Sequence, residues 1–140
     1  MTKNIDYSFF KKALKNLEMQ YSNMKTLEDY PVLMKEAVAE SVIQRFEICS
    51  DLMWKILRKY LNLELGLSEV PSAPKSVFRM AFENKLLPSD IGLWLNYIDV
   101  RNNTSHDYSG EKAQMAIDFM SNFISDAIKL YEVMSKEVWK

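Results

Sequence analysis

The stretch that decides the fold is residues 31–66, PVLMKEAVAESVIQRFEICSDLMWKILRKYLNLELG. Apolar side chains recur in it at three- and four-residue steps, which is the period of one helical face. They are Ala37, Val38, Val42, Phe46, Cys49, Met53, Ile56, Leu57 and Tyr60. Pro31 suits the first helical position and Gly66 suits a stop. The spacing therefore predicts one helix of over thirty residues, roughly 50 Å long at 1.5 Å per residue.

The flanking sequence has the same character. The periodicity predicts further helices at about Tyr7–Met24, Lys75–Leu87 and Glu111–Val138. Another helix is expected to begin at a cap on Ser89 or Asp90 and to run into the polar segment RNNTSHDYSG, residues 101–110. No run of strand length alternates between apolar and polar residues. We expect a single all-α domain over residues 1–140, an up-and-down antiparallel bundle of four to five helices.

Composition excludes several classes of protein. The chain has 140 residues, 48% of them apolar, and only three Gly and four Pro, which favours long helices over a sandwich or barrel. The net charge of −1 argues against a surface broadly adapted to duplex nucleic acid. No apolar run is long enough to span a membrane, and no signal peptide is visible, so we expect a cytoplasmic protein without membrane contact.

No cofactor or metal site stands out. Three isolated Gly cannot form a phosphate-binding loop, and neither HExxH nor CxxC occurs. The single Cys49 lies on the apolar stripe, where we expect a core residue. Lys55, Arg58 and Lys59 form a local basic cluster, which is more simply a solvated helix face than an RNA track.

One polar segment could carry chemistry. It contains Arg101 and His106, the latter being the only His in the chain, followed by Tyr108. The intervening Asn, Asn, Thr and Ser are poor residues for a helix interior, so we expect the helix to end there. An irregular turn can then bring a proton-transferring imidazole and a phosphate-binding guanidinium to one surface. The simpler alternative is a polar helix end that only caps carbonyls.

The pattern R-x4-H-x-Y at this place resembles the signature of the HEPN superfamily (higher eukaryotes and prokaryotes nucleotide-binding). Further segments are similar to its nucleotidyltransferase substrate-binding subfamily, and the resemblance spans about residues 5–135. These segments are Gln44-Arg45-Phe46-Glu47, Trp54-Lys55, Ser76-Val77-Phe78-Arg79-Met80-Ala81, Trp94, Arg101-Asn102 and Ser105-His106-Asp107-Tyr108.

The resemblance implies a dimerising helical bundle that pairs with a minimal nucleotidyltransferase as toxin and antitoxin. It implies a metal-independent ribonuclease in which Arg101 and His106 are the catalytic pair and Asn102 is a supporting residue. Glu47 matches an acidic position on the second helix, and Tyr108 matches a tyrosine that the partner adenylylates.

Chemistry adds a reason for dimerisation. Metal-free RNA cleavage needs a base, an acid and positive charge, and one His cannot easily perform both proton transfers at once. Two copies of the turn at a two-fold seam would supply two His and two Arg. The surplus of apolar positions on the long helix points to such a homodimer. Two alternatives stay open: a non-catalytic subunit that binds a nucleotide or substrate for a nucleotidyltransferase, and a purely structural helical dimer.

Overall fold

The structure is a computed structural model that describes residues 5–104 and 110–140. Within these residues it consists of helices and connecting segments, as predicted. The elements are α1 (Ser8–Lys25), α2 (Val32–Lys59), the π-helical turn η1 (Tyr60–Glu64), α3 (Pro74–Glu83), α4 (Ile91–Asn103) and α5 (Gly110–Ser135).

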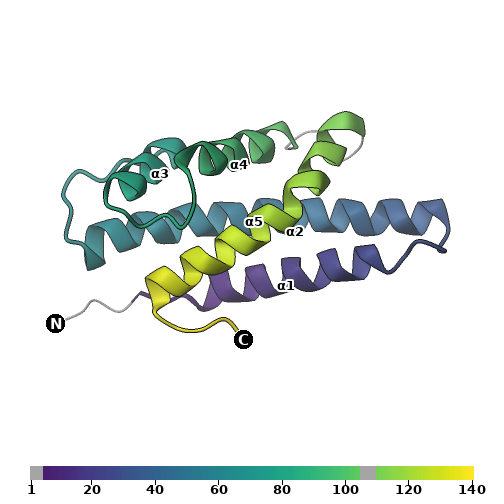
Figure 1. Cartoon of the computed structure of the whole chain (residues 1–140), viewed down its shortest axis with the longest axis horizontal. Helices are drawn as coiled ribbons and strands as arrows, with labels where there is room; N and C mark the ends of the chain where they lie inside the picture. The colour runs from purple at the N-terminus through teal and green to yellow at the C-terminus, as the bar shows by residue number, and fades with distance from the viewer. Residues whose placement is uncertain (1–4, 105–109) are drawn as a thin grey trace.

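The long helix α2 organises the molecule and contacts all four other α-helices. α1 runs antiparallel beside it, α3 and α4 follow one another along its opposite side, and α5 crosses it obliquely (Figure 1). η1 continues α2 to Glu64, and Gly66 then takes a φ of +67°, a conformation that glycine adopts without strain. The predicted helix of over thirty residues is therefore confirmed.

An aromatic chain links the helices across the core. The rings of Phe78 and Trp94 stack with centroids 5.4 Å apart, joining α3 to α4. Tyr97 then meets Phe123 edge to face at 5.3 Å, and Phe123 meets Phe46 at 4.8 Å, joining α4 to α5 and α2. These contacts hold α4 in register with α2, which fixes where the polar end of α4 lies.

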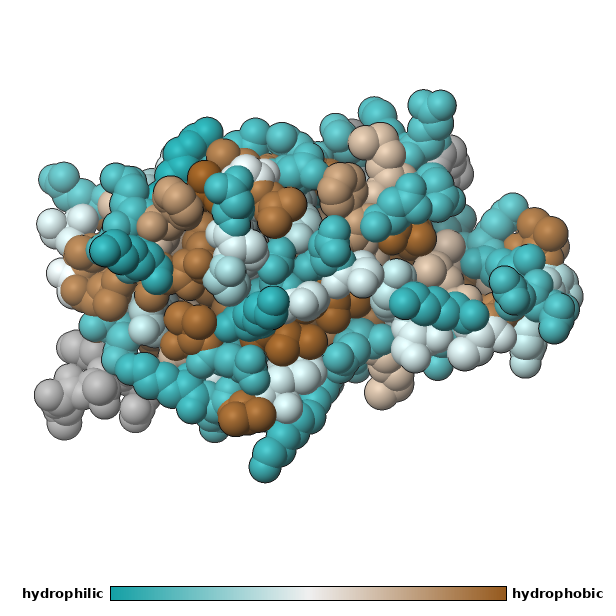
Figure 2. All heavy atoms as spheres, in the orientation of Figure 1, coloured by the Kyte–Doolittle hydropathy of each residue, from teal (hydrophilic) through white to brown (hydrophobic). Residues whose placement is uncertain are grey.

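Most of the residues predicted to be buried are in the core. Cys49 is fully buried, as predicted, and this burial raises the pKa of its thiol. Ala37, placed on the inward stripe, is instead exposed, because the first turns of α2 extend past the neighbouring helices. Figure 2 shows apolar side chains reaching the surface at that end of the molecule. No described helix is both long and apolar enough to cross a membrane.

Polar side chains form hydrogen bonds with backbone groups at the ends of α3 and α4. Asp90 accepts a hydrogen bond from the amide of Gly92, which confirms the predicted cap of α4. α3 ends at Glu83, four residues before the predicted Leu87. The amide side chain of Asn84 donates to the carbonyl of Met80 at 2.8 Å, and Lys85 adopts a φ of +60°, so the helix stops without reaching Pro88. α4 ends at Asn103, inside the polar segment, as predicted.

Candidate functional site

The last turn of α4 holds Arg101 against two carboxylates of α2. Its Nε and Nη2 atoms each lie 3.1 Å from an oxygen of Asp51, so the two groups form a bidentate pair. Its Nη1 atom lies 3.3 Å from Oε2 of Glu47. Glu47 and Asp51 are four residues apart on a helix, so they project from the same face. The guanidinium is thereby fixed in both position and plane.

Thr104 completes this cluster from the end of α4. Its side chain is fully buried, and its hydroxyl lies 2.9 Å from Oε2 of Glu47 and 3.0 Å from the carbonyl oxygen of Arg101. The backbone N–H of Thr104 closes the helix on the carbonyl of Val100. Glu47 therefore accepts from both residues, and it fastens the end of α4 to the middle of α2.

The electrostatic balance of the cluster limits what it can do alone. One guanidinium faces two carboxylates, so the formal charge of Glu47, Asp51 and Arg101 together is −1. The side chains of Glu47 and Arg101 are only 11% and 23% exposed, so their charge-assisted contact holds its geometry better than a fully exposed pair would. The cluster is thus well suited to positioning Arg101, whereas binding an anion there requires additional positive charge.

The structure brings together two of the predicted site residues, Arg101 and Glu47. Asn102 follows Arg101 in the last turn of α4 and is exposed. His106 and Tyr108 lie outside the described residues, in the segment that directly follows the cluster. Their roles therefore stay predictions, as does the arrangement of His106 relative to Arg101.

Two residues of the cluster, Asp51 and Thr104, were not predicted. The helical spacing between Glu47 and Asp51 was a usable signal, because two acidic residues one turn apart can hold one arginine. Thr104 gave no comparable signal, since a threonine in a polar turn is usually solvated. Among the described residues, no group of three or more His, Cys, Asp or Glu side chains could hold a metal ion.

Comparison with known proteins places the chain in a family. Residues 5–136 match the family described as nucleotidyltransferase substrate binding protein like. The chain is 26% identical over 130 residues to a Haemophilus influenzae protein named probable ribonuclease HepT, and the match covers 91% of this chain and 87% of that protein.

Solved structures agree on the fold. A Haemophilus influenzae protein, described as revealing the fold of a substrate-binding domain of a nucleotidyltransferase, superposes with a TM-score of 0.82 at 24% identity. That match covers 93% of this chain and 99% of the other. A protein of Thermus thermophilus superposes with a TM-score of 0.71 at 28% identity, covering 91% of this chain and 97% of the other.

The described residues form a helical bundle in which two carboxylates of α2 bind an arginine at the end of α4. The family match covers nearly the whole chain, so the protein belongs to the nucleotidyltransferase substrate-binding family. This confirms the resemblance inferred from its sequence.

Proposed function

We propose that the protein is a toxin-type, metal-independent RNA endonuclease whose site combines Arg101 and His106 from two copies of the chain. The curated relative's name, probable ribonuclease HepT, supports this activity class. The observation that carries the proposal is the arginine cluster, formed by Arg101, Glu47, Asp51 and Thr104. The carboxylates of Asp51 and Glu47 fix the guanidinium of Arg101, and the Thr104 hydroxyl holds the buried Glu47. The segment that contains the only histidine of the chain follows directly.

The proposed reaction needs two proton transfers. One His106 takes the proton of a ribose 2′-hydroxyl as its oxygen attacks the adjacent phosphorus. A protonated His106 from the second copy gives a proton to the departing 5′-oxygen as its bond to phosphorus breaks. A 2′,3′-cyclic phosphate and a 5′-hydroxyl result, and no metal or redox partner enters the balance.

Arg101 would stabilise the charge that develops on the phosphorane. Because Glu47 and Asp51 outweigh the single guanidinium of each copy, the protonated His106 that serves as the acid would add positive charge beside the two arginines at a shared seam. Glu47 acts as a positioning residue in this scheme, since it holds Arg101 and Thr104. Asn102 would support the pair from the same helical turn.

Control of the toxin would come from a partner minimal nucleotidyltransferase. That enzyme would transfer AMP from ATP to the Tyr108 hydroxyl, forming a phenol–phosphorus bond and releasing pyrophosphate. The family description, which refers to a nucleotidyltransferase, supports such a pairing. The attached phosphate and base would block the site by charge and by bulk.

A second candidate function is a non-catalytic subunit that binds a nucleotide or substrate for the nucleotidyltransferase. The family description favours it directly, since it speaks of substrate binding and not of cleavage. Both functions need the same fold. They differ in whether the chain breaks a phosphodiester bond and in whether His106 is needed.

The discriminating experiment compares wild type with His106→Ala, and with Gln114→Ala as a control on the exposed face of α5. Purified protein is incubated with total RNA in the presence of EDTA, and each variant is expressed alone in cells. We expect wild type and Gln114→Ala to cleave RNA and to slow growth, and His106→Ala to do neither while unfolding at the same temperature. Absence of cleavage by wild type would favour the binding subunit, and full activity of His106→Ala would remove the proposed catalytic pair.

A further inference from the structure

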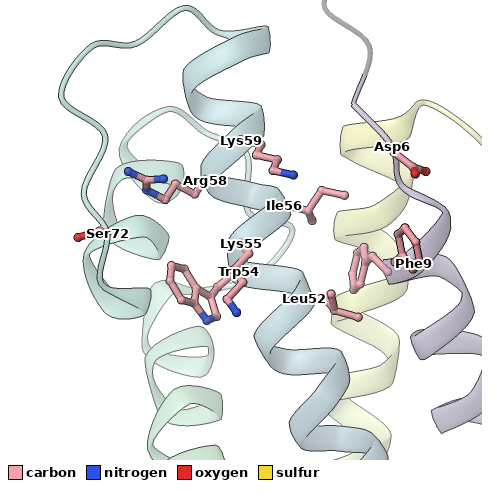
Figure 3. Close-up of a pocket in the computed structure, with 10 residues that line it drawn as sticks. Asp6, Phe9, Leu52, Trp54, Lys55, Ile56, Arg58, Lys59 and Ser72 are labelled. Carbon is pink, nitrogen blue, oxygen red and sulfur yellow. The ribbon is translucent and has the colours of Figure 1, made fainter.

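A basic groove opens on α2 beyond the arginine cluster. A cavity of about 460 Å³ lies between the start of α1, the C-terminal half of α2 and the loop that leads to α3 (Figure 3). Lys55 and Lys59 stand on its α2 face, Arg58 and Ser72 lie along one side, and Asp6 lies on the other. We call this the α2 groove.

The α2 groove is positive although the chain as a whole is not. Three basic side chains and one carboxylate line it, which gives a formal charge of +2 in a chain of net charge −1. The carboxylate of Asp6 already accepts from the backbone amide and hydroxyl of Ser8, at 2.9 and 2.6 Å. Among the described residues, none of the three basic side chains forms a salt bridge. Their charge is therefore available to a ligand.

Arg58 is fixed at the rim of the groove. Its Nε atom donates to the carbonyl oxygen of Pro71 at 2.8 Å, so the side chain is held against the loop. In the described part of the chain neither of its Nη atoms has a hydrogen-bond partner. A guanidinium held in this way keeps its planar fork for the oxygens of a phosphate.

Apolar and aromatic surface accompanies the charge. Leu52, Ile56 and Phe10 contribute apolar walls, and Trp54 and Phe9 lie on opposite sides of α2. The ring of Phe9 is 69% exposed although it belongs to a helix that packs on α2. Cationic side chains interleaved with accessible aromatic rings are the combination that binds single-stranded nucleic acid, because unpaired bases stack on the rings.

The groove continues the candidate site along the same helix. Positions 47, 51, 54 and 58 fall within about 60° of one another around a helix of 3.6 residues per turn. Lys55 and Lys59 follow Asp51 by about 6 and 12 Å along the axis at 1.5 Å per residue. Trp54 and Arg58 therefore lie on the side of α2 from which Asp51 contacts Arg101, and Lys55 and Lys59 are turned from Asp51 by about 40° and 80°.

From these observations we infer that the α2 groove binds single-stranded RNA beside the cleavage site, with Lys55, Arg58 and Lys59 on its phosphates and Phe9 and Trp54 on its bases. This inference rests on the proposed function for its choice of RNA over DNA.

A second cavity of similar size lacks this excess of positive charge. It lies between α1 and α5, and its Lys25 and Lys129 are balanced by Glu18 and Glu132.

The test measures binding separately from cleavage. A fluorescent 2′-O-methyl oligouridine of about twelve nucleotides, within the site sizes usual for single-strand binding, has no free 2′-hydroxyl and cannot be cleaved. It is titrated with the full chain while anisotropy is recorded. The key variant is Lys55→Gln/Lys59→Gln, and its matched control, Lys25→Gln/Lys129→Gln, removes the same charge from the second cavity. Phe9→Ala tests stacking, and its exposed ring makes it safe for folding.

We expect the Lys55→Gln/Lys59→Gln variant to bind roughly tenfold more weakly. The slope of log affinity against log salt should fall by about 1.4, since each phosphate bound by a lysine contributes about 0.7 to it for a single strand. Phe9→Ala should weaken binding about fivefold or more. The control should bind as wild type does. Equal affinities of the groove variant and the control would overturn the inference, as would failure of the wild type to bind at low salt.

Four further outcomes are decisive. Binding through the groove without any RNA cleavage by wild type would uphold the groove and reject the nuclease. Cleavage that is unaffected in Lys55→Gln/Lys59→Gln would reject the groove and leave the nuclease intact. Competition by UMP at the same concentration as the oligonucleotide would indicate a mononucleotide pocket. A Lys55→Gln/Lys59→Gln variant that binds the oligonucleotide normally but no longer binds the nucleotidyltransferase would indicate a protein-docking surface. Either result would overturn the inference.

Discussion

Asp51 and Arg101 meet edge to edge: Nε to Oδ1 and Nη2 to Oδ2 are both 3.1 Å, although fifty residues separate the two in the chain. The pair joins the middle of α2 to the end of α4. Because two parallel hydrogen bonds fix the plane of the guanidinium as well as its position, Asp51 determines how the remaining N–H donors of Arg101 are oriented.

The first prediction follows from this pairing. Asp51→Ala should leave the free energy of unfolding within about 1 kcal/mol of wild type, because the Asp51 side chain is 41% exposed and water screens the pair. RNA cleavage should nevertheless fall by about tenfold to a hundredfold, since a displaced guanidinium no longer meets the phosphate correctly. Chemical denaturation and initial cleavage rates measure the two effects.

Asp99→Ala is the matched control for Asp51→Ala. Asp99 lies on α4, pairs with Lys75 at 2.6 Å, and has a side chain that is 54% exposed. Its substitution should change neither stability nor cleavage appreciably. If the Asp51→Ala protein cleaves RNA as fast as the Asp99→Ala protein, Asp51 does not position a catalytic group.

The second prediction concerns the buried half of the cluster. Thr104→Val preserves shape but removes the hydroxyl that lies 2.9 Å from Glu47, leaving a buried carboxylate with one donor fewer. We expect a loss of about 1–3 kcal/mol in the free energy of unfolding. Glu47→Leu, which offers the hydroxyl no acceptor, and the double variant complete a cycle that isolates the pair. If the two changes in the free energy of unfolding simply add in the double variant, Thr104 and Glu47 do not interact energetically.

The sequence predicted the fold through periodicity, because a stripe such as Val42, Phe46, Cys49 and Met53 has one favourable solution, a buried helical face. It could not predict that α3 ends at Glu83, since the contact of Asn84 with Met80 is local and leaves no periodic trace. The site was predictable only in part. Arg101 was found through a motif, whereas Thr104 became a site residue only because the aromatic core sets α4 against α2.

The third prediction is a loss of stability at alkaline pH. Tyr7 donates to the carbonyl oxygen of Met134 at 3.2 Å, and burial, as the main cause, raises the pKa of the phenol from about 10 to about 12. Between these two values the folded chain retains a proton that the unfolded chain loses, so stability falls as pH rises. Tyr7→Phe should therefore show a shallower decline from about pH 10 to pH 12. Parallel curves for the two proteins, measured by denaturation at each pH, would contradict this assignment.

The fourth prediction is a homodimer. Apolar side chains remain exposed on α2, among them Ile48 at 56%, only one residue from Glu47 of the cluster. Covering them with a second copy would also bring two candidate sites together, as the proposed proton transfers require. Light scattering at micromolar concentration should give twice the monomer mass of 16.4 kDa. Ile48→Glu should shift the mass toward the monomer and abolish cleavage; a wild-type protein that is monomeric throughout would remove the composite site.

The last prediction concerns Tyr108, which follows the arginine cluster in the polar segment DYSG. Co-expression with the partner nucleotidyltransferase in cells that supply ATP should add the mass of one AMP to the chain and should abolish toxicity. The added phosphate would bring further negative charge close in sequence to a cluster whose formal charge is already −1, and the added base would fill space that the substrate needs in the proposed site. Tyr108→Phe should carry no added mass and should stay toxic in the presence of the partner, because a ring without a hydroxyl offers no acceptor.

The matched control is Tyr30→Phe, which changes an exposed tyrosine in the connection before α2. This variant should be modified and silenced like wild type. Intact-mass spectra in which Tyr108→Phe still gains AMP would place the acceptor on another residue.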